Sequence, residues 1–160
     1  MADSKYDVVG IGNAIVDIIG RCDDAFLARH GTAKGTMRLV DASTAIGIHN
    51  DMGPTVEASG GSAANTMVGI ASFGGRSAFV GKVADDDFGR IFAHDLRAAG
   101  VTFNTQPSTG KQPTARSLIL VTPDGERTMN TYLGACPELD RGEVDAELIG
   151  KARIIYLEGY

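Results

Sequence analysis

Short apolar runs of strand character alternate with stretches of helical spacing along nearly the whole chain, and this alternation limits the fold more than any other feature. Alternating strands and helices build layered domains around a mostly parallel sheet. Strands are expected at residues 8–20, 36–40, 55–58 and 77–83. Helices are expected between and after them, at residues 23–29, 41–50, 62–73 and 87–99. The sequence therefore predicts an α/β sandwich.

A hairpin follows in the second half of the chain. The turn Pro123-Asp124-Gly125-Glu126 joins two β-prone runs, Ala115–Val121 and Arg127–Tyr132, and such turns favour antiparallel pairing. A helix is then predicted over Glu143–Ala152. An apolar strand over Arg153–Tyr160 is of the kind that is buried on both faces of a parallel sheet. The chain thus adds a small antiparallel β-lid to the sandwich.

Composition and charge argue against several classes of function. The net charge is −5 and no stretch is rich in Lys and Arg, so a nucleic-acid partner is not expected. The longest uncharged run, Ala58–Gly75, is too polar to cross a membrane, and the charged N-terminus is unlike a secretory signal. Cys22 and Cys136 lack the spacing of a zinc or redox motif. We expect a cytoplasmic protein with two free thiols and no metal site.

Glycine is enriched, with 21 of 160 residues against a usual share of about 7%, which indicates close approach of the backbone to a ligand. Two generic phosphate loops nevertheless fail. Gly10-Ile11-Gly12 lacks the third glycine of a dinucleotide fingerprint, because that place is Ile15. Gly81-Lys82 has Arg76 where a Walker loop needs glycine, and Val83 where it needs Ser or Thr.

Two elements are instead suited to binding a polyol. In an extended chain Asn13, Ile15 and Asp17 point to one side, and a carboxylate can accept both hydroxyls of a vicinal diol. The alternative is a turn asparagine and an exposed strand charge. The second element, Gly60 to Asn65, places bare backbone and an amide at a helix start. Its alternative is an ordinary helix start capped by Ser62.

The two elements, with Val80-Gly81-Lys82-Val83 and Asp86-x-Phe88-Gly89 after them, resemble the ribokinase-like carbohydrate and nucleoside kinases, often called the PfkB family. The resemblance covers essentially the whole chain and departs from the usual pattern at Ala84, where Gly is common. Ribokinases typically have Lys after the two glycines. This chain has Ser62 there, which resembles adenosine kinases. The implied fold is a ribokinase-like three-layer sandwich with a central, mostly parallel sheet and a small β-sheet lid.

The resemblance also implies roles for the matching residues. Asp17 and Asn65 would bind sugar hydroxyls, supported by Asn13, and the Gly60-Gly61 backbone would lie under the sugar. A Gly61→Val protein is therefore expected to keep its fold and bind the acceptor weakly, because the branch fills ligand space. The remaining residues expected to line the substrate site are Ile15, Met37, Ser62, Ser117 and Met129.

Arg127 follows the Asp124-Gly125 turn and resembles an arginine that adenosine kinases carry there. A cation at this place would meet the transferred phosphoryl group, so Arg127 is the candidate catalytic residue within this chain. The alternative is a solvated hairpin arginine.

The resemblance implies that residues 1–160 form the N-terminal, acceptor-binding half of one domain, with lid strands near residues 13–20, 36–40 and 114–132. The Mg-ATP site and the catalytic aspartate would lie in a C-terminal half outside this chain, so the isolated chain is expected to be inactive. The expected reaction is ATP-dependent phosphorylation of the adenosine 5′ hydroxyl. A sugar kinase for ribose, fructose or 2-keto-3-deoxygluconate stays open, as does a noncatalytic binding domain. A monovalent cation activator, and a monomer or a lid-mediated homodimer, are further expectations.

Overall fold

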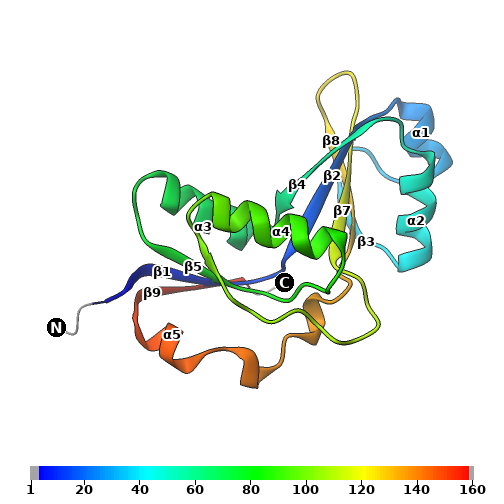
Figure 1. Cartoon of the computed structure of the whole chain (residues 1–160). Coiled ribbons are helices and arrows are strands. Elements are labelled where there is room, and N and C mark those ends of the chain that lie inside the picture. Colours follow the sequence, from blue (N-terminus) through cyan, green and yellow to red (C-terminus); the bar gives the residue numbers. More distant parts are fainter. Residues whose placement is uncertain (1–3, 159–160) are drawn as a thin grey trace.

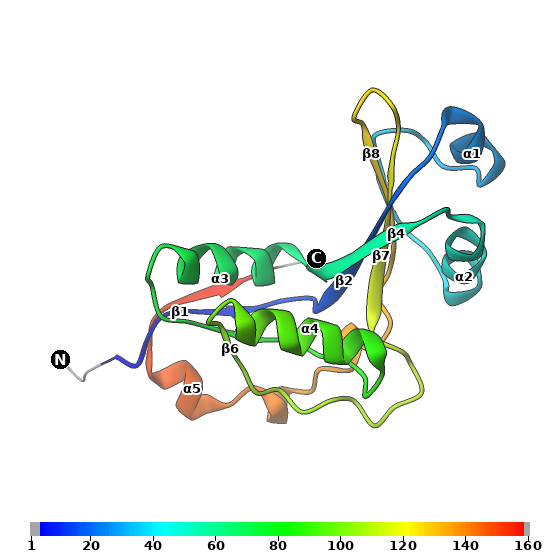
Figure 2. The same cartoon turned by 45° about the horizontal axis from the view of Figure 1, so that its top comes forward.

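Two β-sheets meet at an angle in the computed structural model, which describes residues 4–158 (Figure 1). Sheet A is parallel and has the order β6 (Thr102–Phe103), β5 (Ser77–Val80), β1 (Tyr6–Ile11), β9 (Ala152–Leu157). Sheet B is mixed and has the order β3 (Met37–Leu39), β8 (Arg127–Tyr132), β7 (Ala115–Val121), β2 (Ile15–Arg21), β4 (Thr55–Gly60). Sheet B rises from the end of β1, as both views show (Figure 2).

Helices cover both faces of sheet A. Figure 1 shows α3 (Ser62–Ser72) and α4 (Asp87–Ala98) on one face and α5 (Ala146–Gly150) on the other. Phe79, Phe92 and Phe103 stack between sheet A and α4, with ring centroids 5.3 to 6.1 Å apart. The predicted α/β sandwich with a β-sheet lid is confirmed. The lid was expected to be small and antiparallel, but in the described residues sheet B has five strands against four in sheet A and contains parallel pairs, because β2 and β3 join the β7–β8 hairpin.

Sheet B has its own core on one face. Ile18, Leu118 and Leu120 pack there against α1 (Asp24–Arg29) and α2 (Ala42–Asp51). Side chains alternate between the faces of a strand, so residues 15, 17, 117 and 119 point the other way. That second face of sheet B is the one that meets the N-terminus of α3.

The predicted Asp-x-Phe-Gly motif ties α4 to the lid. The Asp86 side chain caps α4 by accepting the Gly89 N–H (2.8 Å), and it also accepts the Thr114 N–H (2.8 Å) and hydroxyl (2.6 Å). Burial alone would raise the pKa of Asp86, but these hydrogen bonds outweigh it and hold the pKa below its ordinary value. A Cβ at Gly89 would clash with the Ala84 carbonyl oxygen, which explains the glycine. β7 therefore starts from a fixed point on the core.

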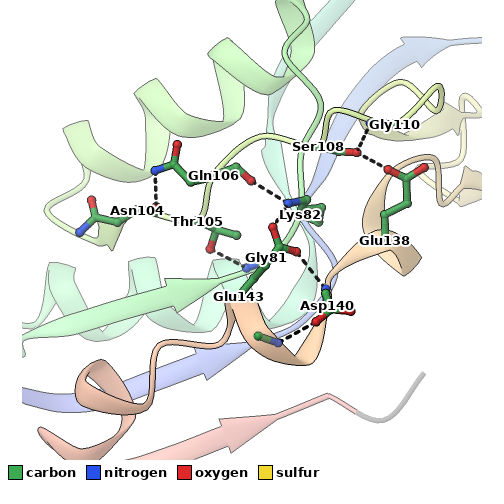
Figure 3. A network of polar contacts seen from close by, with 11 residues as sticks. Gly81, Lys82, Asn104, Thr105, Gln106, Ser108, Gly110, Glu138, Asp140 and Glu143 are labelled. Atoms are coloured by element: carbon green, nitrogen blue, oxygen red, sulfur yellow. Dashed lines mark hydrogen bonds and ion pairs between the residues drawn. The ribbon is translucent and has the colours of Figure 1, made fainter.

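A second polar network fixes two loops beside sheet A (Figure 3). The Lys82 side chain is 5% exposed, and its ammonium donates to the Gln106 carbonyl (3.0 Å) and to Glu143 Oε1. The Ser108 hydroxyl donates to Glu138 and accepts the Gly110 N–H (2.9 Å). The loop before β7 and the loop after β8 are thereby joined at the end of β5.

Three sequence expectations need correction. The strand expected to reach Val83 ends at Val80, because the Gly81 N–H turns to the Thr105 hydroxyl (3.4 Å) instead of a neighbouring strand. The helix expected over 143–152 begins only at 146, because Asp145 caps it there by accepting the Glu147 N–H.

The last strand, β9, was expected to be buried on both faces, and this is wrong for the described residues. Ile154 is 60% and Leu157 66% exposed, because β9 forms an edge of sheet A. The part of the expected strand at residues 159–160 lies outside the described residues. The helices within residues 4–158 are all too short or too polar to span a bilayer.

Candidate functional site

A cavity of about 530 Å³ lies between the open face of sheet B and the start of α3. Its lining residues are Asn13, Ile15, Asp17, Met37, Leu39, Gly61, Ser62, Asn65, Ser117, Ile119, Arg127, Met129, Thr131 and Leu133. The structure therefore brings together every site residue expected from the sequence except Gly60. Their role in binding stays a prediction.

Strand register explains how residues far apart in sequence reach this cavity. Asp17 on β2 pairs with Ser117 on β7, and Ser117 pairs with Thr131 on β8, which gives one polar row across the sheet. The next row along the strands is apolar and consists of Ile119 and Met129, followed by Met37 on β3. The cavity thus has a polar band beside an apolar one.

Asp17 is half-buried at one end of the polar row. Burial raises the pKa of its carboxyl group, while the nearby Arg127 guanidinium acts in the opposite direction. Asp17 pairs with β4 near Gly60, and a Cβ at Gly60 would clash with the Asp17 carboxyl carbon. Gly60 therefore makes room for the carboxylate, and the expectation that its backbone lies under the sugar stays a prediction.

Gly61 is the N-cap of α3 and has φ +87°, in the left-handed region that favours glycine. A Cβ there would lie 2.5 Å from the Asn13 carbonyl oxygen. The expectation that Gly61→Val keeps its fold and only fills ligand space is wrong, because the branch strains the backbone and strikes Asn13. Gly61 also takes the capping position that the alternative interpretation assigned to Ser62.

Ser62 and Asn65 lie in the first turn of α3 at the mouth of the cavity. The Ser62 hydroxyl donates to Glu158 Oε1, and the Glu158 N–H donates to the Ile11 carbonyl (3.2 Å). Glu158 was not among the residues expected at the site. It could have been expected there, because it follows β9 and the carboxyl ends of the neighbouring parallel strands β1 and β9 meet at the same edge of a sheet.

Four further lining residues were also missed, namely Leu39, Ile119, Thr131 and Leu133. Each lies two residues from a residue already expected in the site or from another missed one. The alternation of strand side chains, applied to Met37, Ser117 and Met129, would have found them.

Arg127 begins β8 beyond the hairpin turn and is exposed at the apolar end of the cavity. Asp17 and Arg127 both line the cavity, and the charge of Arg127 acts to lower the pKa of Asp17. The site therefore combines a carboxylate and amides, which can bind hydroxyl groups, with a cation and an apolar wall. Within residues 4–158, no group of three His, Cys, Asp or Glu side chains gathers as metal ligands would.

The chain is similar to known kinases in sequence and in structure. Residues 36–160 match the family model described as pfkB family carbohydrate kinase. The chain has 59% sequence identity to adenosine kinase from Sinorhizobium meliloti. Its structure matches the crystal structure of that protein with a TM-score of 0.92, over 98% of this chain and 48% of that one. The chain is 52% identical, with the same TM-score and shares, to a probable sugar kinase from Rhizobium etli CFN 42.

A curated relative is less similar and belongs to a sugar kinase group. Probable fructokinase-6, chloroplastic, from Arabidopsis thaliana is 37% identical over 102 residues, which cover 62% of this chain and 27% of that protein. The chain thus spans about half the length of the similar solved structures and less of this curated relative.

Proposed function

The chain belongs to the pfkB family of carbohydrate kinases, and from this we propose that it is the acceptor-binding and lid part of an ATP-dependent nucleoside kinase. The proposed acceptor is the 5′ hydroxyl of adenosine. The high identity to an adenosine kinase supports the proposal, while the similarity to fructokinases makes a sugar acceptor the second candidate.

The division of the cavity into a polar and an apolar band is the observation that favours a nucleoside over a monosaccharide as the acceptor. Asp17 and Asn65 supply hydrogen-bonding groups for ribose hydroxyls, and Ile119, Met129 and Met37 supply an apolar wall for a flat base. A volume of about 530 Å³ is in the range of small-molecule sites. A monosaccharide alone would leave the apolar wall uncovered, which is an unfavourable use of such a surface.

In the proposed reaction the acceptor oxygen forms a bond to the γ-phosphorus of ATP. The bond from that phosphorus to the ADP oxygen breaks, and the hydroxyl proton passes to a general base. ATP would supply the phosphoryl group, and its magnesium ion would neutralise the phosphate charge. The residues outside this chain would bind Mg-ATP and carry the base.

The described residues would orient the acceptor and exclude water. Ionised Asp17 accepts hydrogen bonds from vicinal hydroxyls and so fixes the position of the reacting oxygen. Closure of sheet B over the acceptor would keep water from competing as acceptor. Arg127 lies at the rim, where its cation would stabilise the charge of the transferred group.

An acceptor panel on the full-length protein tests this proposal. Initial rates with ATP are measured for adenosine, other nucleosides, ribose, fructose and 2-keto-3-deoxygluconate. The expected result is the highest kcat/KM with adenosine. A higher kcat/KM with fructose or ribose would instead support the sugar kinase, and no turnover with any acceptor would favour a noncatalytic binding domain.

A further inference from the structure

Two hydroxyl groups form a pair in the middle of the lid wall. Ser117 Oγ and Thr131 Oγ1 are 2.9 Å apart, on β7 and β8, and the residues are only 5% and 7% exposed. Both residues line the cavity. Their neighbours along the same face of the two strands are apolar, since Ile119 and Met129 form the adjacent row.

The hydroxyl pair has two donor hydrogens, and the hydrogen bond between the two oxygens uses only one of them. Each hydroxyl carries one donor hydrogen and can accept, so a hydrogen bond between them consumes only one of the two donors. Within residues 4–158, each hydroxyl has the other as its hydrogen-bond partner, and the structure gives the second hydrogen no protein acceptor. Buried donors are normally satisfied, so a molecule inside the cavity is the expected acceptor.

The distance between the pair and Asp17 determines which part of a bound substrate can contact the pair. Asp17, Ser117 and Thr131 lie on three adjacent strands in register. Neighbouring strands are about 4.7–4.9 Å apart, so Thr131 is roughly 9–10 Å from Asp17 across the sheet. A sugar ring held by Asp17 would end before Thr131, whereas the base of a nucleoside would extend over the pair.

We propose that the Ser117–Thr131 pair donates a hydrogen bond to a ring nitrogen of the substrate's base and so selects nucleosides with an acceptor at that edge. This inference rests on the proposed nucleoside kinase function. Ile119 and Met129 would hold the plane of the base, and the hydroxyl pair would set its orientation.

Substrate analogues combined with variants test the pair. Thr131→Val and Ser117→Ala are assayed in the full-length protein with adenosine and with 1-deaza-, 3-deaza- and 7-deazaadenosine. Loss of one hydrogen bond should lower kcat/KM for adenosine about 3- to 10-fold, mainly through KM. One analogue, already poor with the unaltered protein, should lose nothing further in either variant, and the double variant should lose no more than one single variant.

Controls separate recognition from folding. Thr131→Ser keeps the hydroxyl and should retain most of the discrimination between adenosine and that analogue. Thr55→Val makes the same hydroxyl-to-methyl change on β4 outside the cavity and should leave all four rates unchanged. Thermal unfolding of each variant identifies any protein that fails to fold.

The possible results separate a failure of the proposed role of the Ser117–Thr131 pair from a failure of the proposed nucleoside kinase function. Equal losses for adenosine and for all three analogues, or no loss for adenosine, would overturn the role of the pair while leaving the nucleoside kinase in place. Failure of the unaltered protein to phosphorylate any nucleoside, with activity on a sugar, would overturn both.

Discussion

Asp17 has opposite effects on acceptor binding and on the stability of the fold. The carboxylate is half-buried beside Gly60, which lacks the side chain that would displace it. Burial raises the pKa of Asp17, so the folded protein holds its charged form at a cost. Groups of this kind are retained where they serve a ligand, because packing alone would favour a neutral side chain.

Asp17→Ala should lower kcat/KM for the acceptor about 10- to 150-fold, because hydrogen bonds to a charged group contribute about 1.5–3 kcal/mol. Steady-state kinetics of the full-length protein measure this change. Rates equal to those of the unaltered protein would remove Asp17 from the site.

Asp17→Asn should make the ligand-free protein more stable at neutral pH. The pKa of Asp17 is raised in the folded state, so the folded state binds more protons and its stability falls as pH rises from the unfolded pKa through the folded one. The gain from Asn should therefore be present at pH 7, shrink as pH falls through the raised folded pKa, and be lost below the unfolded pKa of about 4. Chemical unfolding at several pH values gives these free energies, and a gain that grew at low pH would contradict the argument.

Gly61→Ala should destabilise the protein more than Gly74→Ala. Both glycines have positive φ, at +87° and +84°, so both substitutions carry about 1–2 kcal/mol of left-handed strain. Only at Gly61 would the new Cβ also meet the Asn13 oxygen, whereas Gly74 has open space. Equal losses in the free energy of unfolding would show that the contact with Asn13 is relaxed at no cost.

At the scale of elements, local signals predicted the lid hairpin well and the segment after it poorly. The observed strands β7 and β8 have the predicted bounds, because a Pro-Asp-Gly-Glu turn and two β-prone runs act locally. The helix near residue 146 is short because Asp145 caps it, and a helix pattern does not reveal which of several acidic residues will cap. The register of the Ser117–Thr131 pair follows from this hairpin turn, whereas the alignment of the pair with Asp17 depends on the pairing of β7 with β2, which no local pattern specifies.

The loops beside sheet A are held by the buried ammonium group of Lys82. Two variants should show that Lys82, rather than its partner Glu143, is the buried member of the ion pair. Glu143→Gln leaves the Lys82 ammonium charged and 5% exposed, so it should cost about 3 kcal/mol. Lys82→Met removes that charge and leaves Glu143, whose side chain is 31% exposed, so it should cost about 1 kcal/mol. Denaturant unfolding measures both, and a larger loss in Lys82→Met would reverse the assignment of the buried partner.

At the scale of the whole molecule, β9 presents an apolar edge. Ile154, Ile155, Tyr156 and Leu157 are 39% to 66% exposed, and the outer side of an edge strand offers backbone groups for pairing. The similar solved structures are about twice as long as this chain.

A polypeptide of residues 1–160 alone should therefore self-associate at micromolar concentration. Light scattering measures the mass as a function of concentration. Ile154→Lys and Leu157→Lys place charges on the exposed edge and should reduce the association, while the same change at the exposed Phe73 should not. A monodisperse monomer would contradict the interpretation of this edge.

A crystal structure of the full-length protein with adenosine would show which residues contact each part of the acceptor. Ribose hydroxyls are expected within hydrogen-bonding distance of Asp17, and the base is expected against Ile119 and Met129 with a ring nitrogen at the Ser117–Thr131 pair. Adenosine bound elsewhere, or a ribose turned away from Asp17 with the apolar wall uncovered, would contradict this expectation.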